Sequence, residues 1–317
     1  MILVTGGTGF IGSLLIEKLL QTGNSVLAIK RKESTIPQTL LYKKNLFWFD
    51  ADITDYFALE DVFTNVSQVY HCAGLVSFDT ADRNLLQKIN VEGTTHIVNL
   101  CLAKKTRLLH VSSVAALGDE KEDTLITEKS KWEWDKKKSA YSVSKFEAER
   151  EVWRGIAEGL DAVIVNPTIV LGAGDKKNGG QIFTRLQKGL KFYPTGSTGF
   201  VDVVDLVNIM IRLMSETQIT GTNFLINNAN MTYQELFEQY AHYHKITPPD
   251  VPASRLLMGV VWRIQNILRL LRLSKSKLSR DIVRSARKKN QYSNEKIIQT
   301  LDYTFKPMKQ TLKELVE

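Results

Sequence analysis

Three side chains suited to proton transfer occur in two segments of the chain. Ser113 follows an apolar run, and Tyr141 and Lys145 come later, near the start of a predicted helix. Because residues four apart share a helix face, the Lys145 ammonium lies one turn from the Tyr141 phenol. The pKa of a tyrosine phenol is ordinarily about 10, and a nearby positive charge favours its phenolate form. Ser113 would hold a substrate oxygen. Tyr292 and Lys296 repeat the Tyr/Lys spacing outside this context, and we interpret that second pair as a coincidence.

The elements that must position these groups alternate between strand and helix. Short β-branched or aromatic runs predict strands at Ile2–Thr5, Ser25–Ile29, Leu46–Asp50, Gln68–Cys72, Arg107–Ser112, Asp161–Asn166 and Thr222–Ile226. Helical periodicity separates them, most clearly over Phe10–Gln21, Ala81–Ala103 and Ser139–Glu158. This alternation predicts an α/β fold with a doubly wound parallel sheet.

The pattern changes after the sixth predicted strand, and beyond Ile226 it is almost wholly helical. We therefore predict two interleaved domains. Residues 1–166 plus about 200–226 would form the dinucleotide-binding domain, and about 167–199 plus 227–317 a smaller, mainly helical substrate domain.

A glycine-rich turn follows the first predicted strand. Gly6, Gly9 and Gly12 stand three residues apart between a strand and a helix. Glycines let the backbone approach a pyrophosphate, and the amides of the helix N-terminus bind its oxygens. We therefore expect a dinucleotide phosphate to contact the segment Gly6–Gly12, through Gly6, Thr8, Gly9, Phe10, Ile11 and Gly12.

The second predicted strand ends in three cations, Lys30, Arg31 and Lys32, where an acid would bind the ribose of NAD. Arg31 and Lys32 suit a 2′-phosphate, so we predict NADP(H), with NAD(H) as the second choice. After the third strand, Asp52 can accept from the adenine amino group while the backbone at Ile53 donates to the ring. Asp52 is equally a candidate helix N-cap, as are Thr54 and Asp55.

Composition excludes several other classes of protein. The net charge of +8 arises largely between residues 253 and 290, which hold 11 basic residues and one acid, so no nucleic-acid site is expected. The two cysteines, Cys72 and Cys101, fit no disulfide framework or metal spacing, and no metal is expected. A signal peptide and a long uncharged stretch are both absent, which predicts a cytoplasmic protein.

The basic segment contains one amphipathic helix, predicted over Ser254–Leu273. We expect its own domain to cover at least half of it. A weak membrane-surface contact through 254–290 stays open as the alternative.

A set of short motifs resembles the extended short-chain dehydrogenase/reductases of the NAD-dependent epimerase/dehydratase superfamily. In family order they are TGGTGFIG (5–12), DITD (52–55), HCAG (71–74), INVEGT (89–94), VSSVAALG (111–118), YSVSK (141–145), NPTIVLG (166–172) and FVDVVDLV (200–207).

The resemblance implies a Rossmann core that binds NAD(P) and a catalytic set of Ser113, Tyr141 and Lys145. It also implies that Asn90 assists this catalytic set through a water molecule or a structural contact. It further implies that Cys72, Ala73 and Gly74 border the cofactor, and that Pro167, Thr168 and Ile169 lie against the nicotinamide. Family members of this type also suggest a homodimer through the helices near Ala81–Ala103 and Ser139–Glu158.

The motif details favour the reductases within this family. Val114 and Ala115 stand where similar sugar-nucleotide dehydratases carry an acid, and the run Gly196–Asp202 lacks the basic residue that epimerases usually carry. NPTIVLG is similar to dihydroflavonol 4-reductases and 3β-hydroxysteroid dehydrogenases, and Val76 would belong to an apolar pocket wall. We therefore predict an oxidoreductase that interconverts a carbonyl and an alcohol on a small, largely apolar substrate. The alternatives are a nucleotide-sugar epimerase, a non-catalytic NADP-binding regulator and a membrane-surface lipid-modifying protein.

Overall fold

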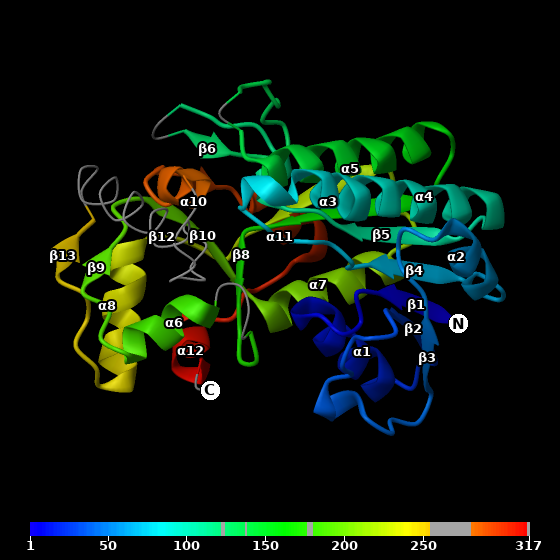
Figure 1. Ribbon diagram of the computed structural model, residues 1–317, viewed down its shortest axis with the longest axis horizontal. Helices are drawn as coiled ribbons and strands as arrows, with labels where there is room; N and C mark the ends of the chain where they lie inside the picture. Colours follow the sequence, from blue (N-terminus) through cyan, green and yellow to red (C-terminus); the bar gives the residue numbers. More distant parts are fainter. Residues whose placement is uncertain (122–123, 137, 176–179, 254–279, 316–317) are drawn as a thin grey trace.

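The computed structural model describes residues 1–121, 124–136, 138–175, 180–253 and 280–315 (Figure 1). The helix expected over 254–273, and with it most of the basic segment, lies outside the described residues. None of the helices in the described ranges combines the length and the apolar character needed to cross a membrane.

A seven-stranded parallel sheet forms the centre of the molecule, in the order β11-β7-β5-β4-β1-β2-β3. Its strands are β1 (Ile2–Thr5), β2 (Val26–Lys30), β3 (Leu46–Asp50), β4 (Gln68–His71), β5 (Arg107–Val111), β7 (Ala162–Pro167) and β11 (Thr222–Ile226). Each lies within one residue of its predicted bounds, and the doubly wound sheet is confirmed. The inner strands are apolar on both faces because helices cover both sides.

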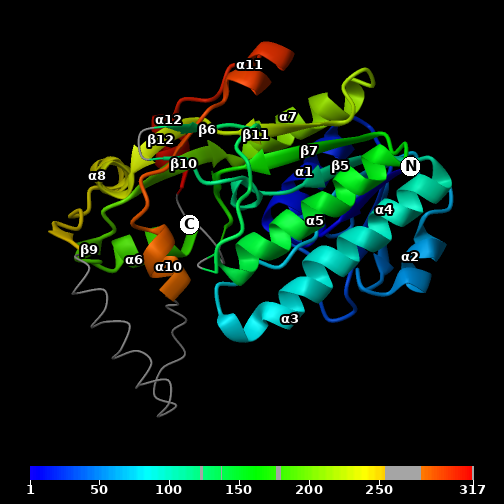
Figure 2. The same ribbon diagram turned by 90° about the horizontal axis from the view of Figure 1, so that it is seen from above.

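Two layers of helices enclose this sheet (Figures 1 and 2). One face is covered by α1 (Phe10–Gln21) and α7 (Val203–Ser215), together with Ile297 and Leu301 of α11 (Glu295–Leu301). The other face is covered by α2 (Tyr56–Val62), α4 (Gly93–Lys104) and α5 (Ala140–Ala157). Apolar stripes at helical spacing meet the sheet in both layers, so the sheet is a rigid base for the loops at its edges.

The strand order reverses at β1. The chain runs from β1 to β2 and β3 on one side, and then crosses to β4 on the other. In open parallel sheets, ligands bind beyond the carboxyl ends of the strands at such a switch point. The loops that follow Thr5 and His71 are therefore the expected location of a site.

A smaller unit lies beside the carboxyl ends of the strands, on the left of Figure 1. Its three-stranded sheet has the order β12-β10-β8. The sheet packs on helices around a hydrophobic core separate from the two cores on either face of the central sheet. Its larger elements are β8 (Ile169–Leu171), α6 (Gly180–Gln187), β10 (Ser197–Asp202), β12 (Ala229–Thr232), α8 (Tyr233–His244) and α12 (Met308–Glu314).

The short elements complete the described chain. They are α3 (Arg83–Leu86), β6 (Leu125–Ile126), β9 (Phe192–Tyr193), β13 (Val251–Pro252), α10 (Arg280–Ser285) and β14 (Gln291–Tyr292). The expectation of an almost wholly helical segment after Ile226 is corrected by β12, β13 and β14. Strands of two to four residues carry too little alternation to be recognised from the sequence, and pairing with distant partners forms them.

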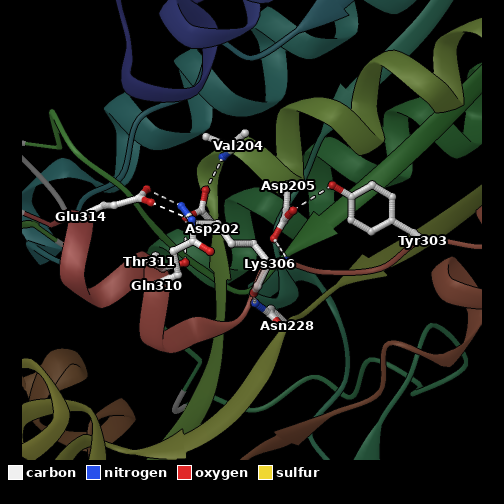
Figure 3. Close-up of polar contacts among 9 residues, drawn as sticks. All are labelled: Asp202, Val204, Asp205, Asn228, Tyr303, Lys306, Gln310, Thr311 and Glu314. Carbon is white, nitrogen blue, oxygen red and sulfur yellow. Dashed lines mark hydrogen bonds and ion pairs between the residues drawn. The ribbon is translucent and has the colours of Figure 1, made fainter.

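Polar side chains join the end of the chain to the start of α7 (Figure 3). Asp202 caps this helix by accepting from the Val204 amide at 2.7 Å. Its other oxygen accepts from Thr311 Oγ1 at 2.8 Å and from Lys306 Nζ at 3.1 Å. Asp205 accepts from the Lys306 amide at 3.0 Å. Because Asp202 is only 2% exposed, these buried bonds attach the C-terminal segment to the end of β10, the central strand of the smaller sheet.

Candidate active site

The glycine-rich turn between β1 and α1 is packed as tightly as its glycines permit. Gly6 has φ +68°, and a Cβ there would lie 2.7 Å from the Ala73 nitrogen. A Cβ on Gly12 would collide with the carbonyl oxygen of Gly6. The N-cap residue of α1, Gly9, has no side chain that could accept a hydrogen bond. The backbone amides of the first turn of α1 are therefore not capped by a side chain. Thr8, Gly9, Phe10 and Ile11 of the predicted set all lie in this turn and are half-buried or exposed.

The three cations after β2 divide into two groups. Lys30 forms an ion pair with Asp50 on the neighbouring strand β3. Arg31 is 57% exposed, with its Nε 3.9 Å from Glu33, and Lys32 is exposed. Arg31 and Lys32 are therefore the two cations of this run that can meet a ligand at the carboxyl end of β2.

The segment after β3 settles which residue caps α2. Asp55 is the N-cap and accepts from the Ala58 amide, whereas Asp52 accepts from the amide and the hydroxyl of Thr54 at 2.9 and 2.8 Å. Burial tends to raise the pKa of Asp52, but the Thr54 bonds and the charge of Arg31 outweigh it and lower that pKa. Asp52 thus remains an ionised acceptor, while the Ile53 side chain packs against Gly93 at the start of α4.

A chain of hydrogen bonds runs from Thr5, at the start of the glycine-rich turn, to the helix that carries Asn90. Ala73 N donates to Thr5 Oγ1 at 3.1 Å, and Thr94 Oγ1 donates to the Asn90 carbonyl at 2.6 Å. His71 bridges the two hydroxyls, with Nδ1 2.7 Å from Thr5 and Nε2 3.0 Å from Thr94. Since the Thr94 proton is already used, Nε2 of His71 is the donor and Nδ1 accepts from Thr5. The neutral imidazole therefore links the predicted Cys72–Gly74 loop to Asn90.

The structure brings Ser113, Tyr141 and Lys145 together. Ser113 follows β5 and accepts from the Ala115 amide at 3.1 Å, and its side chain is hydrogen bonded to Tyr141. Tyr141 lies in the first turn of α5, which Ser139 caps. Lys145 is 6% exposed, and its Nζ donates to the Val111 carbonyl at 2.9 Å. The two segments thus meet because the N-terminus of α5 packs against the end of β5.

The pKa values in this group differ from the simple expectation. Burial raises the pKa of Tyr141, and its hydrogen bond with Ser113 lowers that pKa only in part. Burial lowers the pKa of Lys145 to about 8, against the opposing charge of Glu149. Because the ammonium is directed at Val111, it does not offset the burial of the phenol. Tyr141 therefore holds its proton in this state.

Asn90 lies in a π-helical turn, Gln87–Glu92, and is 2% exposed. Its Nδ2 donates to the Leu75 carbonyl at 3.0 Å and to Ser144 Oγ at 2.9 Å, while Oδ1 accepts from the Leu75 amide at 2.7 Å. π-helical turns often occur at functional sites. Here Asn90 joins the loop after β4 to α5, the helix of Tyr141, through its hydrogen bond to Ser144.

Two further sets of predicted residues border this group. The Phe78 ring lies 5.5 Å from the Tyr141 ring, and Val76, 44% exposed, precedes it in the same loop. Pro167, Thr168 and Ile169 connect β7 to β8, where Thr168 Oγ1 donates to the Ile226 carbonyl at 3.2 Å. Both sets stand at or beyond the carboxyl ends of strands of the central sheet, and Phe78 places an apolar ring next to the phenol.

The second Tyr/Lys pair lies elsewhere. Tyr292 belongs to β14 and is 6% exposed, and its carbonyl accepts from Asn227 and Asn230. Lys296 donates to Thr222 Oγ1 and to the Asn223 carbonyl, at 2.6 and 2.7 Å. Both residues hold the C-terminal segment against β11.

Sequence reasoning missed Glu149, a buried carboxylate one helical turn beyond Lys145, although its partners Ser112 and Asn166 stand in the motifs VSSVAALG and NPTIVLG. The spacing of four residues from Lys145 was the available signal.

The residues at the switch point fit a dinucleotide. The crowded positions at Gly6 and Gly12 leave the approach to the α1 N-terminus free of side chains, and uncapped amides there suit a pyrophosphate. Arg31, Lys32 and Asp52 stand farther along the same edge, where an adenosine would lie.

Fold and site together define a dinucleotide-binding protein of the Rossmann class. Residues 2–226 match the model of the NAD dependent epimerase/dehydratase family, and the chain belongs to that family. The resemblance seen in the motifs is thereby confirmed.

Named relatives include several reductases. A putative dihydroflavonol 4-reductase from Synechocystis sp. is 29% identical over 326 residues, covering 99% of this chain and 92% of that protein. Tetraketide alpha-pyrone reductase 2 from Arabidopsis thaliana is 32% identical over 243 residues, covering 69% and 75%.

Solved structures share the fold. The crystal structure of gox2253 matches with a TM-score of 0.84 at 24% identity, over 99% of this chain and 96% of that one. WbmG from Bordetella bronchiseptica, in complex with NAD and UDP, matches with a TM-score of 0.78 at 21% identity, over 99% and 93%.

Proposed function

We propose that this chain is an NADP-dependent oxidoreductase of the extended short-chain type, which interconverts a carbonyl and an alcohol on a small, largely apolar substrate. The observation that carries the proposal is that Ser113, at the end of β5, meets the first turn of α5, where Tyr141 lies one helical turn from Lys145. An acid, an oxygen-orienting hydroxyl and a cation beside a dinucleotide loop are the groups that such a reaction needs.

The three residues divide the work in the direction of reduction. Ser113 orients the carbonyl oxygen by donating a hydrogen bond to it. Tyr141, which holds its proton because burial raises its pKa, donates that proton to the same oxygen. Lys145 would hold the ribose of a bound NADP(H) and supply positive charge as the phenol loses its proton. Bound NADP(H) supplies or accepts the hydride.

The substrate class is inferred from the wall around the phenol. The Phe78 ring offers apolar surface next to Tyr141, and the exposed Val76 precedes it in the same loop. Val114 and Ala115 provide no acid for a dehydration, and both named relatives above are reductases. WbmG binds UDP, but at 21% identity this likeness concerns the fold. These observations favour a carbonyl reductase over the epimerase alternative.

The cofactor preference is inferred from charge. Arg31 and Lys32 stand exposed at the end of β2, and the nearest acid of that loop is Glu33. Two cations attract a 2′-phosphate, which a carboxylate would repel, so NADP is favoured over NAD.

The test is a screen of NADPH oxidation against apolar ketones and aldehydes, followed by Tyr141→Phe. The variant should lose at least about 100-fold in kcat and keep its NADPH affinity, because it lacks only the acid proton. Tyr292→Phe, in the second Tyr/Lys pair, is the matched control and should keep the wild-type rate. A wild-type rate in Tyr141→Phe would refute the assignment, and tight UDP-sugar binding without reductase activity would favour the epimerase.

A further inference from the structure

Glu149 is a buried acid on α5, the helix that carries Tyr141 and Lys145. It is 6% exposed and lies on α5 one turn beyond Lys145. Ser112 Oγ and Asn166 Nδ2 both donate to Oε2 at 2.6 Å, and Trp153 Nε1 donates to Oε1 at 3.2 Å. A buried carboxylate is costly unless its oxygens receive such bonds, so three donors at one acid indicate a built arrangement rather than an accident of packing.

Two of these donors lead directly to Ser113. Ser112 is its neighbour in the chain, and Asn166 Nδ2 also donates to the Ser113 carbonyl at 3.1 Å. Asn166 is in turn held by Asn223, whose Nδ2 donates to Oδ1 at 3.3 Å. The carboxylate therefore ties the end of β5 to the end of β7 and sets the backbone from which Ser113 projects.

The same carboxylate acts on Lys145 through its charge. Burial lowers the pKa of the Lys145 amine to about 8, and the charge of Glu149 opposes this fall. The other titratable neighbours are Cys72 after β4, His71 on β4 and His110 on β5, all of them neutral. In the described residues, no lysine or arginine lies within ion-pair distance of Glu149. Lys145 is thus the cation whose charge Glu149 balances, without a direct contact.

We propose that Glu149 is a positioning residue, which holds Ser113 through Ser112 and Asn166 and keeps Lys145 charged one helical turn from Tyr141. This inference rests on the proposed function for its catalytic consequence. Its electrostatic part concerns the chain alone and can be measured without a substrate.

The first experiment measures the Lys145 amine directly. The wild type and Glu149→Gln are labelled with ¹³C at lysine Cε, and the Lys145 signal is assigned by its absence in Lys145→Met. The pKa of Lys145 should fall by about one unit in Glu149→Gln, because a neutral amide no longer offsets burial. Glu151→Gln, on the same helix but paired with Arg154, is the control and should leave the pKa unchanged. An unchanged pKa in Glu149→Gln would overturn the electrostatic part.

The second experiment follows turnover. Glu149→Gln should lose at least about ten-fold in kcat with little change in NADPH affinity, and the limb of its pH profile set by the amine should move to lower pH. Glu151→Gln should match the wild type. If Glu149→Gln does not fold, Ser112→Ala replaces it and should lower kcat at least about three-fold.

The outcomes separate the two proposals. A wild-type kcat and pH profile in Glu149→Gln, or in Ser112→Ala where the first variant does not fold, overturns the positioning role, provided that Tyr141→Phe is inactive. An active Tyr141→Phe refutes the proposed function instead, and the NMR measurement then still decides the link between Glu149 and Lys145.

Discussion

His110 offers a sharp test of how burial controls ionisation beside the site. It lies on β5, is 1% exposed, and neither ring nitrogen has a hydrogen-bond partner among the described residues. Its ring is 5.1 Å from that of His71. Burial, assisted by the charge of Lys145, lowers the pKa of His71 to about 3 and that of His110 well below its usual value. Both rings are therefore neutral in the folded protein at pH 5.

The sign of the effect follows from proton uptake. In the unfolded chain a histidine titrates near pH 6.5. Below that pH the imidazole binds a proton in the unfolded state but stays neutral in the folded state. Stability is thus fully present above pH 6.5 and is lost as the pH falls toward 3. Between pH 7.5 and pH 5.0 each buried neutral histidine should cost about 2 kcal/mol of the free energy of unfolding, or about 4 kcal/mol for the pair.

The assay is urea unfolding of the wild type and of His110→Leu at both pH values. At pH 7.5 the variant should lie within about 1 kcal/mol of the wild type, because leucine removes no hydrogen bond. At pH 5.0 the variant should have lost about 2 kcal/mol less than the wild type. His242→Gln, at an exposed position of α8, is the control and should follow the wild type. Equal losses in the wild type and His110→Leu would refute the claim that His110 stays neutral.

Three other expectations can be checked independently. Arg31→Ala should raise the Kd for NADPH at least about ten-fold and leave that for NADH nearly unchanged, and equal binding of both cofactors by the wild type would contradict the NADP preference. Asp202→Ala should lower the free energy of unfolding by about 3 kcal/mol, since α7 loses its cap and buried donors lose their acceptor; a loss below about 1 kcal/mol in a denaturant titration would contradict this. Light scattering at micromolar concentration should detect a homodimer formed through α4 and α5, and a monomer would contradict it.

Local signals in the sequence were sufficient to predict the central sheet and the glycine-rich turn after β1. The seven strands are short apolar runs buried on both faces, and such runs are visible because helices with a different period separate them. The turn at Gly6 needs a positive φ and a close approach to Ala73, which only glycine allows, so its residue types reveal it. The Tyr141 and Lys145 pair was recognisable because one helical turn joins them.

Tertiary structure alone decided which polar groups meet inside the protein. Glu149 and Asn166 come from an amphipathic helix and an apolar strand, where a polar residue ordinarily faces solvent or fills an isolated position. Asp202 meets Lys306 and Thr311 across about a hundred residues. Such contacts leave no periodic trace in the chain, because a buried charge is stabilised by partners that only the packing of distant elements can supply.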